Sequence, residues 1–199
     1  MNTYFVKFID KPIKIDGNPE KEIWKFTEAL KLRNYMGDYP SHFPNVEVKL
    51  LYDKINIYVL FKVVDKNIIS RAKKHFDAVY EDSCVEFFFA TDLDNPGAYF
   101  NLEVNCSGKV LFGFRTDKSK KSTRINIEDI ECLNINTTYF GKLINDEIKE
   151  ETEWIAEYKI PFNILKKYTG KEIKVNNKEW NANFYKCADK SSTPHWLTW

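Results

Sequence analysis

The stretch that decides the fold is Ala98-Tyr99-Phe100-Asn101-Leu102-Glu103-Val104-Asn105, in which apolar and polar residues alternate without a break. Along an extended strand, successive side chains point to opposite faces, so the apolar residues share one face and their neighbours share the other. Such alternation is typical of an antiparallel sheet that buries one face and leaves the other open. The stretch therefore predicts a strand with an outer row of Tyr99, Asn101, Glu103 and Asn105.

The same period of two recurs along the rest of the chain. Asp53-Lys54 separates two alternating runs and predicts a hairpin, and Pro161–Tyr168 is predicted to be a short helix, because proline is tolerated in a first helical turn. Short strands without a regular strand–helix rhythm predict an all-β fold, an antiparallel two-sheet β-sandwich of the jelly-roll-like kind with one short helix, formed by residues 1–199 as a single domain. The other predicted strands are Val46–Tyr52, Ile55–Val63, Ser83–Ala90, Lys109–Arg115, Trp154–Ile160 and Glu179–Cys187.

Charge and hydropathy exclude several classes of protein. The 199 residues include 30 Lys and Arg against 29 Asp and Glu, a net charge of +1. A protein that binds nucleic-acid phosphates needs a basic face, so this balanced charge argues against that class. The longest apolar runs, such as Tyr58–Phe61 and Phe87–Ala90, are far shorter than the roughly 20 residues that span a bilayer. We expect no nucleic-acid or membrane partner and a monomer. No signal peptide is visible, which predicts a cytoplasmic protein, or a secreted one whose leader was removed.

Cysteine and histidine patterns provide no catalytic or zinc motif. Cys84, Cys106, Cys132 and Cys187 are far apart, which fits neither a paired zinc motif nor a disulfide scaffold and predicts free buried thiols. The chain has only three histidines and lacks the local signatures of hydrolases, metalloproteases and phosphate-binding loops.

The outer row of the predicted sheet is the most informative candidate site. Carboxylates, amides, a guanidinium and aromatic rings on one face suit a polyhydroxylated ligand, because each sugar hydroxyl both donates and accepts while a ring packs against the C–H face. The alternative is an ordinary solvated sheet face with cross-strand ion pairs. Strand parity places on this row Glu86, Asn101, Glu103, Asn105, Lys109, Arg115, Asn183 and Tyr185.

Two further features each have two interpretations. Asp92 and Asp94, with Asn95, could hold calcium through their oxygens, or they could simply form the turn that ends in Pro96-Gly97. Among the tryptophans, Trp24, Trp154 and Trp180 lie on the apolar side of their segments and are predicted to be core residues. Trp196 is either a ligand platform or a core residue.

The order of motifs resembles the family 9 carbohydrate-binding modules and their DOMON-like relatives. The resemblance rests on Ile15-Asp16-Gly17 followed by Trp24, on Tyr80–Phe88, on Tyr99–Asn105 with Gly108, on Trp154–Pro161, on Trp180–Lys186 and on Pro194–Trp199.

That resemblance implies a β-sandwich and a role as a non-catalytic module of xylan- and cellulose-degrading enzymes, with sugar held between two aromatic rings and structural calcium. It implies a stacking role for Tyr80, six residues before Glu86, where characterised members have Trp. It also implies hydrogen-bonding roles for Glu86, Asn101, Glu103 and Asn105. The family pattern continues beyond Trp199 into a segment that carries the second ring, so either Trp196 takes that role here or the clamp is incomplete.

These observations predict non-catalytic binding of xylan- or cellulose-type oligosaccharides or chain ends in support of carbohydrate catabolism, with a glycoside hydrolase as a partner. Calcium is expected at Asp92 and Asp94, and haem is not, because the only methionines are Met1 and Met36. The alternatives are a DOMON-like sandwich with another ligand or a structural role, and a hydrolase that uses Glu86 and Glu103. The predicted ligand-binding residues are Tyr80, Glu86, Asn101, Glu103, Asn105, Arg115 and Trp196.

Overall fold

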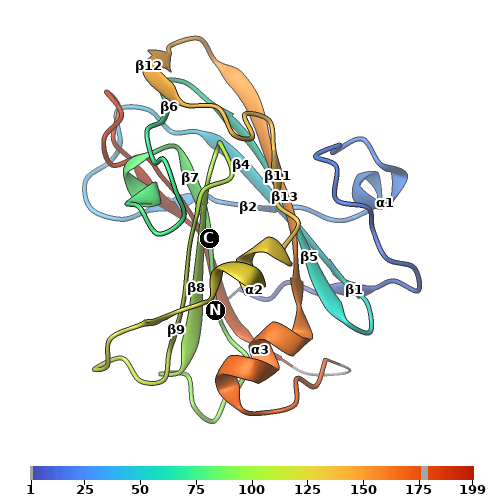
Figure 1. The fold of residues 1–199 in the computed structure, drawn as a ribbon. Coiled ribbons are helices and arrows are strands. Elements are labelled where there is room, and N and C mark those ends of the chain that lie inside the picture. The colour runs from blue at the N-terminus through green and yellow to red at the C-terminus, as the bar shows by residue number, and fades with distance from the viewer. Residues whose placement is uncertain (1, 176–178) are drawn as a thin grey trace.

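Strands dominate the computed structural model, which describes residues 2–175 and 179–199 (Figure 1). Within these residues the helices are α1 (Glu22–Lys25), α2 (Ile127–Glu131) and α3 (Phe162–Thr169), with a 3₁₀ turn, η1, at Val79–Glu81. The longer strands are β4 (Asn45–Tyr52), β5 (Asn56–Asp65), β7 (Cys84–Ala90), β8 (Tyr99–Asn105), β9 (Val110–Arg115), β12 (Ile144–Ile148), β13 (Thr152–Pro161) and β14 (Asn181–Cys187). The short strands are β1 (Lys7–Phe8), β2 (Leu30–Lys31), β3 (Asn34–Tyr35), β6 (Ile68–Ser70), β10 (Thr123–Arg124), β11 (Asn136–Thr137) and β15 (Trp196–Thr198).

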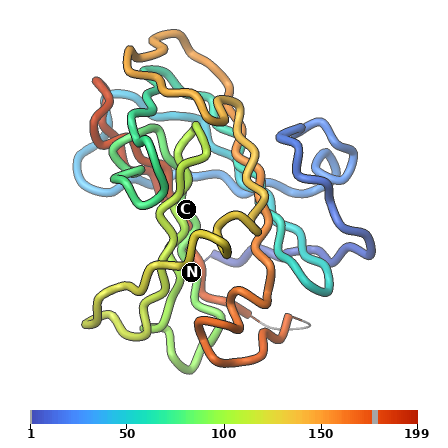
Figure 2. The backbone as a smooth tube through the Cα atoms, in the orientation of Figure 1, coloured from blue at the N-terminus to red at the C-terminus, as the bar shows by residue number. Residues whose placement is uncertain are grey.

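Two sheets form the sandwich that the sequence predicts. One has the strand order β10-β9-β8-β7-β14-β15-β3, and the other has the order β1-β4-β5-β13-β11 with β2 beside β4. All neighbouring strands pair antiparallel except β1 and β4, which are parallel. Figure 2 follows the chain from the blue N-terminal segment on one side to the red β14, which lies beside the green β7.

The interior between the sheets is built from one face of each strand. Phe87 and Phe184 stack with ring centroids 4.7 Å apart, and Phe61 from the opposite sheet meets Phe184 at 6.0 Å. The alternation of β8 is confirmed, because Phe100 and Leu102 are buried in this core.

β6 and β12 form a separate two-stranded sheet. No helix among the described residues is long and apolar enough to cross a bilayer.

A second, smaller core explains why β5 is buried on both faces. The N-terminal segment and α1 lie on the side of β5 and β13 that faces away from β7 and β8 (Figure 1). Trp24 packs there against Tyr58 and Leu60 of β5. The N-terminal segment thus covers a face that would otherwise expose apolar residues.

Glu157 of β13 holds this N-terminal segment in place. Its carboxylate is fully buried and accepts four hydrogen bonds: Oε2 from the amides of Asp16 (3.0 Å) and Gly17 (2.7 Å), and Oε1 from Lys21 Nζ (2.6 Å) and Trp24 Nε1 (2.7 Å). Gly17 has a φ of +74°, a conformation that glycine adopts at no steric cost. Two motifs that are far apart in the sequence therefore meet at one buried carboxylate.

The helix expected at Pro161–Tyr168 is observed as α3, one residue later, with Pro161 immediately before it and Gly170 ending it at a φ of +69°. Helices α1 and α2 were not predicted. They have four and five residues, too few to show a helical period.

The core predictions hold for the tryptophans and for three of the cysteines. Trp24 and Trp154 are completely buried, and Trp180 is half-buried and stacks on Phe89 at 5.6 Å. Cys84, Cys106 and Cys187 are free and buried. The prediction of burial is wrong for Cys132, which is exposed because it lies at the solvent-facing end of α2.

Candidate functional site

The outer face of the seven-stranded sheet carries a row of polar side chains that crosses four strands and ends at Leu111 of a fifth. Strand register pairs Leu111 of β9 with Glu103 of β8, Glu103 with Glu86 of β7, Glu86 with Tyr185 of β14, and Tyr185 with Thr198 of β15. Glu86 and Tyr185 are half-buried, while Glu103 is 7% exposed. The structure thus brings two of the predicted glutamates side by side.

Burial makes both of these glutamates hold protons more tightly than usual. The pKa of Glu103 rises to about 8 because its carboxyl is removed from water and because Glu86 lies beside it. Burial also raises the pKa of Glu86, and the Cys187 thiol partly offsets this by donating to Glu86 Oε1 at 2.9 Å. At neutral pH Glu103 is therefore a neutral acid, which can donate one hydrogen bond and accept others.

Amides and aromatic rings border the two carboxyl groups. Asn101 donates to Glu103 Oε1 at 3.2 Å, and Asn183 donates to the Tyr185 hydroxyl at 3.1 Å and to Thr198 Oγ1 at 2.9 Å. Register places Phe88 between Asn101 and Asn183, and its ring meets that of Tyr185 at 5.1 Å. Alternation alone could have assigned Phe88 to this outer face.

The two aromatic residues expected to flank the row, Tyr80 and Trp196, are both hydrogen-bonded to the same loop residue, Asp189. Trp196 donates from Nε1 to Asp189 Oδ1 at 2.7 Å, and the amide of Asp189 donates to the Tyr80 carbonyl oxygen at 3.2 Å. Both rings are accessible, with Tyr80 40% and Trp196 38% exposed. This exposure argues against the core interpretation of Trp196, and its role as a ligand platform stays a prediction. Asp189 was missed because no local pattern marks a loop residue that connects two distant aromatic residues.

A buried ionic cluster lies beneath this loop. Lys186 Nζ contacts Asp65 Oδ2 at 2.9 Å and His195 Nε2 at 2.7 Å, and all three side chains are completely buried. Burial and the neighbouring lysine lower the pKa of His195 to about 3, so the ring is neutral and Nδ1 donates to the Thr193 carbonyl oxygen at 2.8 Å. Because His195 precedes Trp196 directly, the cluster positions the start of β15.

Asn105 does not belong to the exposed row. It is completely buried, and its carboxamide contacts the Asp82 carboxylate at 2.8 Å, Ser70 Oγ at 3.1 Å and the amide of Lys109 at 2.7 Å. Alternation assigned Asn105 correctly to the outer side of β8. The segment around Ser70 and Asp82 covers that side, which the local sequence does not reveal.

Arg115 lies at the other end of the face. It stacks over Tyr99 at 5.7 Å, and its guanidinium donates to the Lys118 carbonyl oxygen. Since Tyr99 pairs with Arg115 in the register, both lie four residues along β8 from Glu103. Arg115 is thus separated from the pair of carboxyl groups.

The turn at Asp92 and Asp94 is stabilised by contacts within the chain. Asp92 Oδ1 accepts from the Asp94 amide at 3.1 Å, and Asp92 Oδ2 pairs with Lys171 Nζ at 2.6 Å. An ammonium group on one oxygen and a backbone amide on the other leave little room for a cation. These contacts favour the turn interpretation, and calcium binding at this turn stays a prediction.

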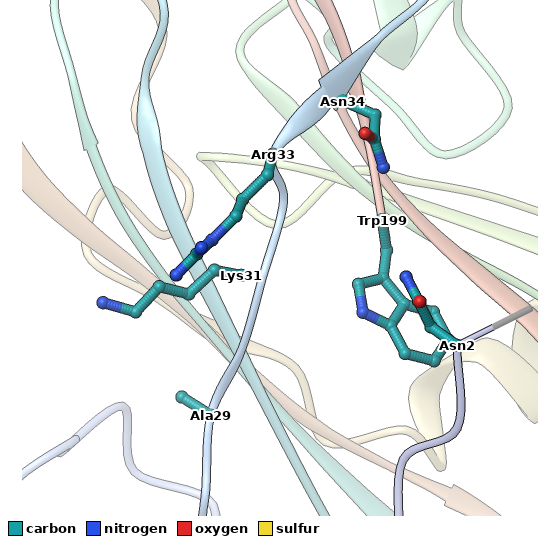
Figure 3. Close-up of a pocket in the computed structure, with 6 residues that line it drawn as sticks. All are labelled: Asn2, Ala29, Lys31, Arg33, Asn34 and Trp199. Atoms are coloured by element: carbon teal, nitrogen blue, oxygen red, sulfur yellow. The ribbon is translucent and has the colours of Figure 1, made fainter.

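The structure also contains a hollow that the sequence analysis did not predict. It has a volume of about 400 Å³ and lies where the chain passes from β2 in one sheet to β3 in the other. In Figure 3 the side chains of Lys31 and Arg33 extend to one side, with Trp199 and Asn2 opposite. The hollow is lined by Asn2, Ala29, Lys31, Arg33, Asn34 and Trp199, and therefore contains none of the predicted site residues.

Comparisons with solved structures support the fold. A candidate carbohydrate-binding protein from Bacteroides uniformis has a TM-score of 0.85 and 24% identity, with 98% of this chain and 87% of that chain covered. A family 9 carbohydrate-binding module from Caldicellulosiruptor kristjanssonii, solved with glucose, has a TM-score of 0.61 and 18% identity, covering 97% and 84%. A second structure from that organism, with cellotriose, has the same TM-score and identity and covers 97% and 82%.

A comparison with curated protein sequences finds no match. The family model described as "Carbohydrate-binding family 9" matches residues 22–199, which include β7, β8, β14 and β15 with their outer face. The chain is therefore a member of carbohydrate-binding family 9.

Proposed function

We propose that this chain binds carbohydrate without catalysing a reaction, and that a sugar ring lies on the outer face of the seven-stranded sheet beside Tyr80 and Trp196. The observation that carries this proposal is that Asp189 links two exposed aromatic residues, through the indole of Trp196 and the backbone carbonyl of Tyr80. Trp196 is the cross-strand partner of Cys187, whose thiol contacts Glu86. Membership of the family supports the same ligand class.

The chemistry of this face matches the hydroxyl groups of a sugar. The neutral carboxyl of Glu103 supplies a donor, and the oxygens of Glu86 and Asn101 supply acceptors. The rings of Tyr80 and Trp196 supply the apolar surface on which the C–H face of a pyranose packs. A face built from paired donors and acceptors recognises a neutral ligand without needing net charge.

For the ligand class, we propose chain ends or oligosaccharides of the xylan and cellulose type, bound in support of carbohydrate breakdown by a partner glycoside hydrolase. The complexes of the Caldicellulosiruptor kristjanssonii modules with glucose and cellotriose support this choice. The distance of Arg115 from the carboxyl pair also suits a ligand of more than one ring.

Titration calorimetry with glucose, xylose, cello-oligosaccharides and xylo-oligosaccharides tests the proposal. We expect micromolar to millimolar dissociation constants, roughly −4 to −8 kcal/mol. Tyr80→Ala and Trp196→Ala should each weaken binding by about tenfold or more, because each removes the packing of one ring on the sugar. Phe26→Ala is the matched control, since Phe26 is 79% exposed and follows α1 on the other side of the sandwich.

Two results would contradict the proposal. One is heat at the level of dilution for every sugar at millimolar concentration. The other is release of reducing sugar from xylan or cellulose by the purified chain, which would show that the chain is catalytic and make Glu86 and Glu103 the first carboxyl groups to replace.

A further inference from the structure

Two cysteines and one glutamate meet on the outer face of the seven-stranded sheet. Cys84 of β7 and Cys187 of β14 are direct cross-strand partners, and Glu86 lies two residues along β7 from Cys84. The two Sγ atoms and a carboxylate oxygen of Glu86 all lie within 4.8 Å of one another. Cys187 Sγ and Glu86 Oε1 are 2.9 Å apart.

This arrangement is close to what a zinc ion requires. Zinc binds thiolate sulfur at about 2.3 Å and carboxylate oxygen at about 2.0–2.2 Å in tetrahedral geometry, so its ligand atoms lie about 3.8 Å apart or less. The ligand atoms, none more than 4.8 Å from another, would need to shift by only about 1 Å to reach these spacings. Soft thiolate ligands select such an ion over calcium or magnesium.

A second observation points to a ligand at the same place. Glu103 is the cross-strand partner of Glu86 and is 93% buried (7% exposed), yet its Oε2 has no hydrogen-bond partner among the described residues. A buried oxygen without a partner costs free energy. An ion held by the neighbouring Glu86 would give this oxygen a partner, either directly or through a bound water.

Access to this cluster comes from the open face of the sheet. Cys84 and Cys187 are buried, and they pack with Val79 and Leu111. Glu86 is half-buried on the sheet face, so an ion can meet its carboxylate first and the thiols afterwards.

We propose that Cys84, Cys187 and Glu86, with Glu103 beside them, form a binding site for a thiophilic divalent cation, Zn²⁺. Binding breaks the S–H bond of each cysteine, forms two Zn–S bonds and one Zn–O bond, and releases two protons to solvent without any redox change. Because cysteine binds zinc as the thiolate, zinc affinity should increase with pH. The proposal goes beyond carbohydrate binding.

Metal titration of the full chain, reduced and dialysed against chelator, tests the site without any sugar. Zinc affinity is measured by competition with a chromophoric chelator, and Co²⁺ serves as a spectroscopic probe whose thiolate charge-transfer band reports sulfur ligation. We expect one bound ion and the band in the wild-type chain. Cys187→Ser should weaken zinc binding by more than about 100-fold, since loss of a ligand exceeds the roughly 10- to 100-fold effect of outer-shell changes. Cys132→Ser, which changes the exposed thiol, is the matched control.

A second variant covers the case in which Cys187→Ser does not fold. Glu86→Gln keeps the shape of the side chain and should also weaken zinc binding, while zinc should raise the unfolding temperature of the wild type more than that of the variant. Absence of the cobalt band, equal affinity in Cys187→Ser and Cys132→Ser, or a Cys84–Cys187 disulfide that persists after treatment with reductant would each overturn the proposal. None of these outcomes bears on sugar binding, which the calorimetry measures separately in metal-free buffer.

Discussion

Replacement of Glu157 by alanine is the sharpest test of how this fold is held together. The substitution removes an acceptor from four donors at once: the amides of Asp16 and Gly17, the ammonium of Lys21 and the indole of Trp24. Hydrogen bonds to a charged group contribute about 1.5–3 kcal/mol each when measured singly, but they are not additive. Removing one partner of a buried ion pair costs about 3–5 kcal/mol.

We therefore expect Glu157→Ala to lower the free energy of unfolding by about 3–5 kcal/mol. In a chain of this size, each kcal/mol corresponds to about 2–4 °C, so the unfolding temperature should fall by roughly 6–20 °C. The loss arises mainly because the Trp24 indole, fully buried, is left without an acceptor and because the chain around Gly17 loses its anchor on β13.

The assay is urea unfolding followed by tryptophan fluorescence and circular dichroism, repeated by calorimetry. Glu153→Ala provides the control on the same strand, because Glu153 is exposed and pairs with Lys62 at 2.9 Å on the surface. Such a pair contributes up to about 1 kcal/mol. A loss in Glu157→Ala no larger than that in Glu153→Ala would refute the view that one buried carboxylate holds the N-terminal segment.

Two further predictions concern the candidate site. The folded-state pKa of Glu103, about 8, lies above the ordinary glutamate value of 4.5, so its contribution to stability is complete below about pH 4.5 and is lost as the pH rises through 8. Between pH 6 and pH 9, ionisation of Glu103 should lower the free energy of unfolding by roughly 3 kcal/mol. The free energy of unfolding of Glu103→Gln, measured with urea, should therefore depend less on pH than that of the wild type. Equal pH slopes for the two proteins would contradict the raised pKa. Asn105→Ala should destabilise the chain by about 2–4 kcal/mol because it leaves buried partners unsatisfied, with saccharide affinity at 25 °C changed less than about twofold. Asn101→Ala should have the opposite effect: it should lower saccharide affinity with little loss of unfolding free energy. Calorimetry on both variants measures the saccharide affinity and the stability of each and so checks this difference between the two asparagines.

Local alternation was enough to locate one helix and every longer strand except β12, whose three central residues are all polar. The hydrophobic pattern of β8, β7 and β14 is imposed by burial of one face, so it is visible in any short window of the chain. The short strands β2, β3 and β15 were not predicted, because two or three residues carry no period. Their pairing partners are also far away in the sequence.

The candidate site was predicted only in part, for a related reason. Parity assigned Glu86, Glu103 and Asn101 to the outer face, and the register of β7 and β8 brings them together. Parity could not show that Asn105 is covered by the segment around Ser70 and Asp82. Burial on the outer side of a sheet depends on what a distant segment does, and no window of the sequence contains that information.

By itself, the sequence determined the fold class and the faces of the main strands, because these follow from side-chain parity. The ligand class rested on the resemblance of its motifs to the family. Only the tertiary structure decided which of those side chains meet. It linked Tyr80 and Trp196 through Asp189, joined Glu157 to the N-terminal segment, and placed Cys84 and Cys187 opposite each other. The physical reason is that hydrogen bonds, ion pairs and metal sites act over a few ångströms in space, and strand pairing brings together residues that the sequence separates.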